Sequence, residues 1–211
     1  MPPAATRRSN VSRSQGGRPA TGLATVSCIV RTSESRHRRV EGDTCPQPRY
    51  PSRVDRDEII RVLRAFETSG LEYVLIGAAA MGFHGLVRAT EDLDLVIRAT
   101  PENVERLRAA LRQAYQNDPD IDEISADDLL GDYPAIRYYP PTGDVYFDVL
   151  TRLGDAERFE TVEAEIREIE GARVWVATPA ALYRLKKGTV RPIDHQDAAA
   201  LRERFNLKDE A

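Results

Sequence analysis

The sequence predicts an α+β fold in which helices flank a mixed β-sheet. Three observations lead to this prediction. Apolar residues recur at helical spacing in several stretches, and polar and apolar residues alternate from residue 92 as in a half-buried strand. Two turn-like sequences, 140–143 and 170–171, each join two strand-like runs. Hairpins clustered in the middle of a chain, rather than regular strand–helix–strand repeats, are typical of this class.

The first 53 residues are predicted to form a disordered basic tail. They hold ten Arg against three acidic residues, a net charge of +7, and are rich in Ser and Pro. Such a segment cannot bury enough apolar surface to offset the entropy lost on ordering. The Pro-rich run at 45–51 is interpreted as a linker to one domain at 54–207. Residues 54–211 hold 20 basic and 31 acidic residues, a net charge of −11, so bulk charge does not favour strong nucleic-acid binding by the domain.

Composition also limits the compartment. No run of about 18 apolar residues exists, so we expect no transmembrane helix and no membrane partner. The start of the chain lacks the apolar stretch of a signal peptide. Both cysteines, Cys28 and Cys45, fall in the tail, and a disulfide framework is not expected. A cytoplasmic location is the simplest expectation.

The predicted elements have local start and stop signals. Ser69-Gly70 ends the first helix, while Thr100-Pro101 and Thr178-Pro179 each supply an N-cap followed by Pro at the first helical position. The acidic stretch 117–131 is expected to be a loop with one helical turn from Ser125. In order, we expect helix 59–69, strand 72–76, helix 78–83, strand 92–97, helix 101–112, strands 135–139, 145–150, 161–169 and 173–176, and helices 179–187 and 192–205.

Asp92 and Asp94 are the main chemical signal. Residues i and i+2 of a strand share one face, about 6.5–7 Å apart, so both carboxylates would sit side by side. Oxygen ligands in this arrangement suit Mg²⁺, although an acidic solvent face is the alternative interpretation. Upstream, Gly77 at a strand-to-helix turn would let the backbone approach a phosphate. Asp148 lies between apolar strand residues, as a third acidic ligand or as an edge-strand surface residue.

Residues 73–96 resemble the signature of the DNA polymerase β-type nucleotidyltransferase superfamily, and more narrowly its AbiEii-type abortive-infection toxin branch. The matching features are Gly77-Ala78, His84-Gly85, Arg88-Ala-Thr90 and Asp92-Leu-Asp94. The resemblance implies a nucleotidyltransferase-like fold and a site with two Mg²⁺ ions. By this implication Asp92 and Asp94 bind the metal that bridges the nucleotide phosphates. Asp148 completes the site and activates the acceptor hydroxyl.

The resemblance also implies a nucleotide site. Gly77, Ala78, Arg88 and Thr90 correspond to nucleotide-binding positions, and Lys186 to a catalytic lysine that neutralises a phosphate. A solvated lysine at a helix end is the alternative for Lys186. His84 is interpreted as part of a helix end.

Further along the chain, Arg191, Asp194 and Asp197 follow the family pattern. Two positions depart from it: Ala78 replaces a second Gly or Ser, and Ile193 stands where relatives often have Lys. Both departures leave the carboxylates in place and are compatible with altered activity.

The implied reaction is transfer of a nucleoside monophosphate from a nucleoside triphosphate to an acceptor hydroxyl. The toxin resemblance implies a tRNA 3′ end as acceptor and a cognate antitoxin as partner. Two alternatives stay open at this point: transfer to a small molecule, as in antibiotic nucleotidyltransferases, and a non-catalytic module that binds a nucleotide or a partner.

Overall fold

The computed structural model describes residues 27–28, 56–116, 118–131, 134–143, 145–154 and 157–208, and every structural statement below concerns these residues. The predicted disordered tail, 1–53, lies outside them except for Ser27–Cys28. These two residues form the short strand β1, a departure from the disorder expected there. No helix in the described ranges is long and apolar enough to cross a membrane.

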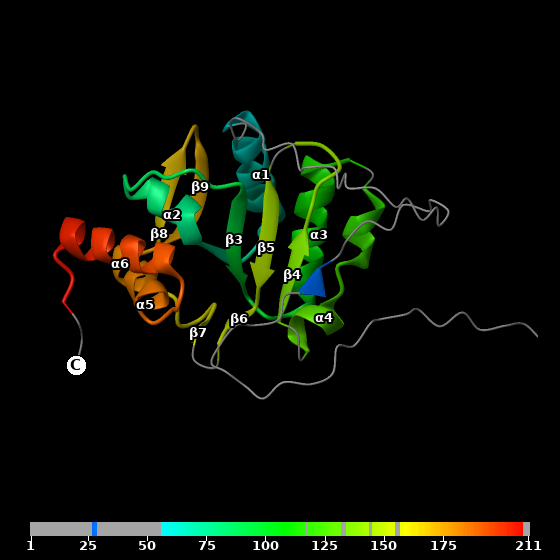
Figure 1. Ribbon diagram of the computed structural model, residues 1–211. Coiled ribbons are helices and arrows are strands. Elements are labelled where there is room, and N and C mark those ends of the chain that lie inside the picture. Colours follow the sequence, from blue (N-terminus) through cyan, green and yellow to red (C-terminus); the bar gives the residue numbers. More distant parts are fainter. Residues whose placement is uncertain are drawn as a thin grey trace, which may run out of the picture.

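In the described residues, helices and strands alternate along the chain as far as Ala114, after which two short helices, the remaining strands and the last two helices follow in turn (Figure 1). The helices are α1 (Arg56–Ser69), α2 (Gly77–Phe83), α3 (Pro101–Ala114), the 3₁₀ helix η1 (Pro119–Glu123), α4 (Ala126–Leu130), α5 (Pro179–Lys187) and α6 (Pro192–Phe205). The strands after β1 are β2 (Tyr73–Ile76), β3 (Asp92–Ile97), β4 (Ala135–Tyr138), β5 (Tyr146–Leu150), β6 (Arg152–Leu153), β7 (Glu157–Arg158), β8 (Ala164–Ile169) and β9 (Ala172–Ala177).

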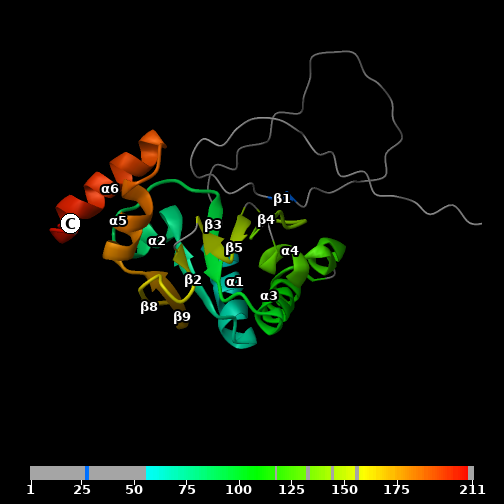
Figure 2. The ribbon, with the colours of Figure 1, turned by 90° about the horizontal axis from the view of Figure 1, so that it is seen from below.

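A mixed sheet forms the centre of the fold, in the order β1-β4-β5-β3-β2-β9-β8. Strands β3 and β5, β2 and β9, and β1 and β4 pair in parallel, while the other neighbours are antiparallel. Both predicted hairpins, β4–β5 and β8–β9, are present. The view from below shows α1 and α3 together on one side of the sheet, with α5 and α6 beside the β8–β9 end (Figure 2). The predicted α+β class with a mixed sheet is confirmed.

Burial explains why the central strands are so apolar. All four residues of β2 are buried, and in β3 the side chains of Leu93 and Leu95 enter the core while Asp92 and Asp94 point to the other face. The predicted caps are present, since the Thr100 and Thr178 side chains accept hydrogen bonds from backbone N–H groups of their own helices.

Two regions differ from the prediction. The acidic stretch 117–131 contains η1 and α4, because Ile121, Ile124 and Leu129 are fully buried and anchor it to the core. Ser125 is the N-cap of α4, as expected for a helical turn at this point. The small hairpin β6–β7 was not predicted, since two-residue strands carry no alternation signal.

Candidate metal and nucleotide site

Strands β3 and β5 bring three aspartates together. Asp94 and Asp148 are direct neighbours in the parallel β3–β5 register, and Asp92 precedes Asp94 by two residues on the same face. One carboxylate oxygen from each of the three lies within 4.8 Å of the others. The expected convergence of Asp148 with the Asp92–Asp94 pair is therefore observed, and its cause is the parallel pairing of their strands. The role of the trio as metal ligands stays a prediction.

Electrostatics at this cluster favour a cation. Burial of the carboxyl raises the pKa of Asp94 to about 7, and the charges of Asp92 and Asp148 act in the same direction. Lys186 and Arg191 oppose the shift but do not cancel it. A bound divalent cation would reverse this penalty because it prefers ionised oxygen ligands. The donor set, three carboxylates with no sulfur or imidazole, fits a hard cation such as Mg²⁺.

Asp92 is oriented by two hydroxyl groups. Thr90 Oγ1 donates a hydrogen bond to Asp92 Oδ1, and the Tyr146 hydroxyl lies 3.4 Å from Asp92 Oδ2. The Thr90 hydroxyl, which the resemblance assigns to the nucleotide, is thus used here to hold a candidate metal ligand. Its contact with a nucleotide stays a prediction.

Asp148 is held by an arginine that sequence reasoning missed. Arg137 Nε donates to Asp148 Oδ1 and Arg137 Nη2 donates to Asp148 Oδ2, each at 2.6 Å. This forked pair raises the pKa of the Arg137 guanidinium further above its ordinary range. The guanidinium carbon also lies 4.8 Å from the centre of the Tyr146 ring. The signal was available, because Arg137 stands opposite Asp148 once the β4–β5 hairpin register is known.

The turn from β2 into α2 comes very close to the trio. Gly77 begins α2 with a φ of +67°, a region that L side chains rarely adopt. A Cβ atom there would lie 1.9 Å from Asp94 Oδ2. The predicted glycine turn therefore places backbone directly against a candidate metal ligand, with the buried Ala78 behind it.

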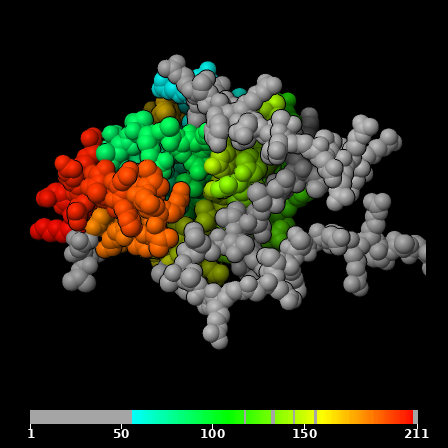
Figure 3. Space-filling view, in the orientation of Figure 1, coloured from blue at the N-terminus to red at the C-terminus, as the bar shows by residue number. Residues whose placement is uncertain are grey.

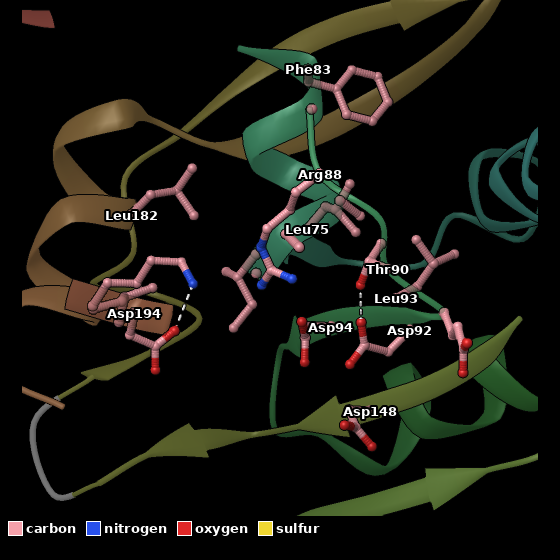
Figure 4. Close-up of a pocket in the computed structure, with 18 of the residues that line it drawn as sticks. Leu75, Phe83, Arg88, Thr90, Asp92, Leu93, Asp94, Asp148, Leu182 and Asp194 are labelled. Atoms are coloured by element: carbon pink, nitrogen blue, oxygen red, sulfur yellow. Dashed lines mark hydrogen bonds and ion pairs between the residues drawn. The ribbon is translucent and has the colours of Figure 1, made fainter. Parts of the chain in front are cut away.

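These residues line one cleft of about 1350 Å³. Gly77, the three aspartates and Arg137 lie on its sheet side, whereas Leu182, Lys186, Arg191 and Asp194 come from α5 and the start of α6. The close-up shows the aspartates on neighbouring strands, Leu182 and Asp194 on the far side, and Arg88 between the two groups (Figure 4). On the surface, the orange and red α5–α6 region adjoins the green α2 region (Figure 3). The cleft thus brings chain segments together that are about ninety residues apart in sequence.

Residues 61–186, more than half of the chain, match the family described as nucleotidyl transferase AbiEii toxin, type IV toxin–antitoxin system. The chain belongs to the AbiEii nucleotidyltransferase family. It is therefore a nucleotidyltransferase, as the resemblance of residues 73–96 implies.

Solved structures provide two further comparisons. An antigenic nucleotidyltransferase-like protein from Paracoccidioides brasiliensis is 17% identical, with a TM-score of 0.43, over 71% of this chain and 78% of its own. The antibiotic-resistance factor ANT(2'')-Ia is 16% identical, with a TM-score of 0.37, over 71% of this chain and 90% of its own. A search of curated sequences gives no significant match.

In this AbiEii protein Lys186 is buried, so the alternative of a solvated lysine is wrong. Its Nζ atom lies 2.8 Å from both Asp194 Oδ1 and Asp197 Oδ2 and so joins α5 to α6. Burial acts to raise the pKa of Asp194, but hydrogen bonds from Lys186 and Thr189 outweigh it and leave the pKa below its ordinary value. The ammonium charge is already compensated by two carboxylates. Its expected contact with a phosphate stays a prediction.

Two other residues of the AbiEii signature have clear positions. Arg88 lines the cleft, with its Nε atom 3.3 Å from Asp197 Oδ2, so its guanidinium lies between α6 and the aspartate trio. His84 is buried at the end of α2, where its Nε2 atom lies 2.8 Å from the Ala177 carbonyl oxygen. His84 therefore has the helix-end position that was expected.

Proposed function

We propose that this AbiEii nucleotidyltransferase transfers a nucleoside monophosphate from a nucleoside triphosphate to an acceptor hydroxyl in a Mg²⁺-dependent reaction. One observation carries the proposal: carboxylate oxygens of Asp92, Asp94 and Asp148 lie within 4.8 Å of one another at the wall of a large cleft. Phosphoryl-type transfer needs little covalent help from a protein, because positioning and charge neutralisation supply most of the rate.

Each aspartate has a distinct role in this proposal. Asp92 and Asp94 hold the divalent ions, with Asp92 fixed by Thr90 and the Tyr146 hydroxyl. Asp148 completes the ligand set and orients the acceptor hydroxyl. Two Mg²⁺ ions, held by these carboxylates, would supply positive charge next to the reacting phosphate.

The nucleotide occupies the cleft between the sheet and α5–α6. Gly77 and Ala78 line the cleft beside Asp94, so phosphates bound there can lie against the backbone at the start of α2. Arg88 supplies positive charge from the middle of the cleft, because only Asp197, which Lys186 also contacts, is its ion-pair partner in the described ranges. Lys186 acts here mainly by holding α5 and α6 in place, and the third N–H of its ammonium can donate to a phosphate.

The first experiment incubates the protein with labelled triphosphates, Mg²⁺ and total RNA. We expect label transfer by the wild type and a loss of at least about 100-fold in Asp94→Asn. Asp122→Asn is a matched control, because Asp122 is an exposed aspartate paired with Arg112 on a distant helix. Equal signals from the wild type and Asp94→Asn would remove the basis for the proposal.

We further propose that the protein acts within a toxin–antitoxin pair, since the family description names a type IV toxin. As its acceptor we propose a tRNA 3′ end, which the resemblance of residues 73–96 implies. The strongly acidic domain favours a second candidate, a small-molecule acceptor that needs no extended basic surface. Salt dependence distinguishes the two, because RNA binding loses affinity steeply with ionic strength. Calorimetry with a non-hydrolysable triphosphate separates both from a non-catalytic module, for which no Mg²⁺-dependent nucleotide binding is expected.

A further inference from the structure

Arg137 ends a row of charged side chains that crosses three strands. Arg137 on β4 is the direct neighbour of Asp148 on β5, and Asp148 is the direct neighbour of Asp94 on β3. The row lines the cleft. Asp148 is only 14% exposed, so the Arg137–Asp148 pair is shielded from water more than an ordinary surface ion pair.

The three aspartates are not equivalent towards a cation. Both oxygens of Asp148 already accept charge-assisted hydrogen bonds of 2.6 Å from Arg137. Among the residues that the structure describes, Asp92 and Asp94 form no such pair with a lysine or arginine, and Asp92 accepts hydrogen bonds only from hydroxyl groups. In the described residues, a divalent ion therefore meets two carboxylates that no lysine or arginine pairs and one, Asp148, that a guanidinium already pairs.

Charge balance points in the same direction. Three ionised aspartates beside one guanidinium leave two negative charges, which a single divalent ion neutralises. A second ion would have to approach the positive charge of Arg137 or displace it from Asp148. Lys186 and Arg191 also act on Asp94, but both form ion pairs with carboxylates of α6, Asp194 and Asp197, which reduces their weight in this balance.

We propose that Arg137 is a positioning residue that occupies Asp148 in the nucleotide-free protein and restricts tight divalent-cation binding to one ion at Asp92 and Asp94. This inference rests on the proposed metal-dependent function. A phosphate group offers the guanidinium the same forked acceptor geometry as a carboxylate, so an incoming triphosphate provides a new partner for Arg137. The Tyr146 ring, 4.8 Å from the guanidinium carbon, keeps the side chain at the site during that exchange. Asp148 is then released to a second ion.

The test measures Mn²⁺ binding without nucleotide, by calorimetry and by electron paramagnetic resonance of free Mn²⁺. The wild type should bind one ion tightly. Arg137→Met keeps the apolar stem over Tyr146 but removes the charge, and should bind Mn²⁺ about tenfold more tightly or bind a second ion. Arg137→Lys keeps the charge but cannot donate two parallel hydrogen bonds to Asp148. Its Mn²⁺ affinity should therefore lie between those of the wild type and Arg137→Met. Arg112→Met, the same substitution at the exposed Arg112–Asp122 pair, should match the wild type.

Thermal unfolding gives a second readout and also shows whether each variant is folded. Without metal, Arg137→Met should unfold at a lower temperature, because Asp148 loses its partner, and Mn²⁺ should raise its midpoint more than that of the wild type. The proposal is overturned if Arg137→Met binds Mn²⁺ no more tightly than the wild type and Mn²⁺ raises its unfolding midpoint by no more than that of the wild type. An absence of Mn²⁺ binding in both proteins without nucleotide also overturns it. The metal-dependent function itself fails only if Mn²⁺ also does not bind in the presence of a non-hydrolysable triphosphate.

Discussion

Gly77 and Asp94 are packed so closely that a Cβ atom on Gly77 would lie 1.9 Å from Asp94 Oδ2. The approach follows from the sheet, since Ile76, the last residue of β2, is the direct antiparallel neighbour of Asp94 on β3. The chain then turns at Gly77 with a φ of +67°. Any side chain at this position would therefore both strain the backbone and displace a candidate metal ligand.

We expect Gly77→Ala to lower nucleotidyl transfer by about 100-fold, because a ligand shift on the ångström scale is enough for a loss of that size. The φ strain should lower the unfolding free energy by about 1–3 kcal/mol. Gly70→Ala is the matched control: Gly70 has a φ of +66°, but nothing lies within 4 Å of its Cβ position. It should lose comparable stability and keep its activity. Full activity in a folded Gly77→Ala protein would contradict this account.

The raised pKa of Asp94 predicts a pH-dependent stability in the metal-free protein. The folded-state pKa is about 7, against an ordinary value of 3.8 for the unfolded chain. Between about pH 4 and pH 7 the Asp94 carboxyl is protonated in the folded state and ionised in the unfolded chain. The stability that this difference gives the folded state is fully present below about pH 4 and is lost as the pH rises through about 7. Asp94→Asn removes the ionisation. In urea unfolding with EDTA present, the unfolding free energy of Asp94→Asn should be higher than that of the wild type at about pH 8. At about pH 4 the difference should be much smaller.

An equal difference between Asp94→Asn and wild type at both pH values would show that Asp94 ionises normally. Asp92→Asn provides an internal check, because the charge of Asp92 contributes to the shift at Asp94. In that variant the pKa of Asp94 should be raised less, so the loss of stability with rising pH should be complete at a lower pH than in the wild type. Mg²⁺ binding should weaken as the pH falls below about 7, since protons compete with the ion for Asp94.

Lys186 should contribute strongly to folding stability. Removing one partner of a buried ion pair leaves uncompensated charge, which here means two carboxylates, and the expected cost of Lys186→Met is about 3–5 kcal/mol. Lys187→Met is the control on the same helix, because Lys187 is exposed and its contact with the Tyr183 ring, 5.4 Å from Nζ, should be worth no more than about 1 kcal/mol. Wild-type stability in an inactive Lys186→Met protein would instead assign Lys186 to the phosphates.

Sequence patterns predicted the elements that carry the site, because each element has a local cause. Alternation at 92–97 reflects a strand with one buried face, and the two Thr-Pro pairs start α3 and α5. The convergence of Asp148 with Asp94 depends on the parallel β3–β5 pairing. Local sequence does not determine which strands become neighbours, so only the family resemblance placed Asp148 in the site before the structure did.

The partners of charged residues were the main omission. The sequence did not single out Arg137, and it left Lys186 as either a catalytic lysine or a solvated helix-end lysine, because their partners in space lie on other elements. Ion pairing depends on tertiary packing, and neither composition nor periodicity reports it. Asn103 on α3 is a further case, because its polar side chain is fully buried and bonded to partners on another segment.

Asn103 should therefore be a stabilising residue with no part in the chemistry. Its Oδ1 atom accepts a hydrogen bond of 2.9 Å from the Glu72 backbone N–H, and its Nδ2 group donates to the Glu72 and Arg98 carbonyl oxygens. Both carbonyls keep other partners, so Asn103→Ala leaves mainly the Glu72 N–H unpaired at the start of β2, at a cost of about 1–3 kcal/mol. Gln113→Ala, at an exposed position of α3, is the control and should be nearly neutral in urea unfolding. Equal stabilities of the two variants would mean that β2 does not depend on this side chain, and that the start of this strand is held by other contacts.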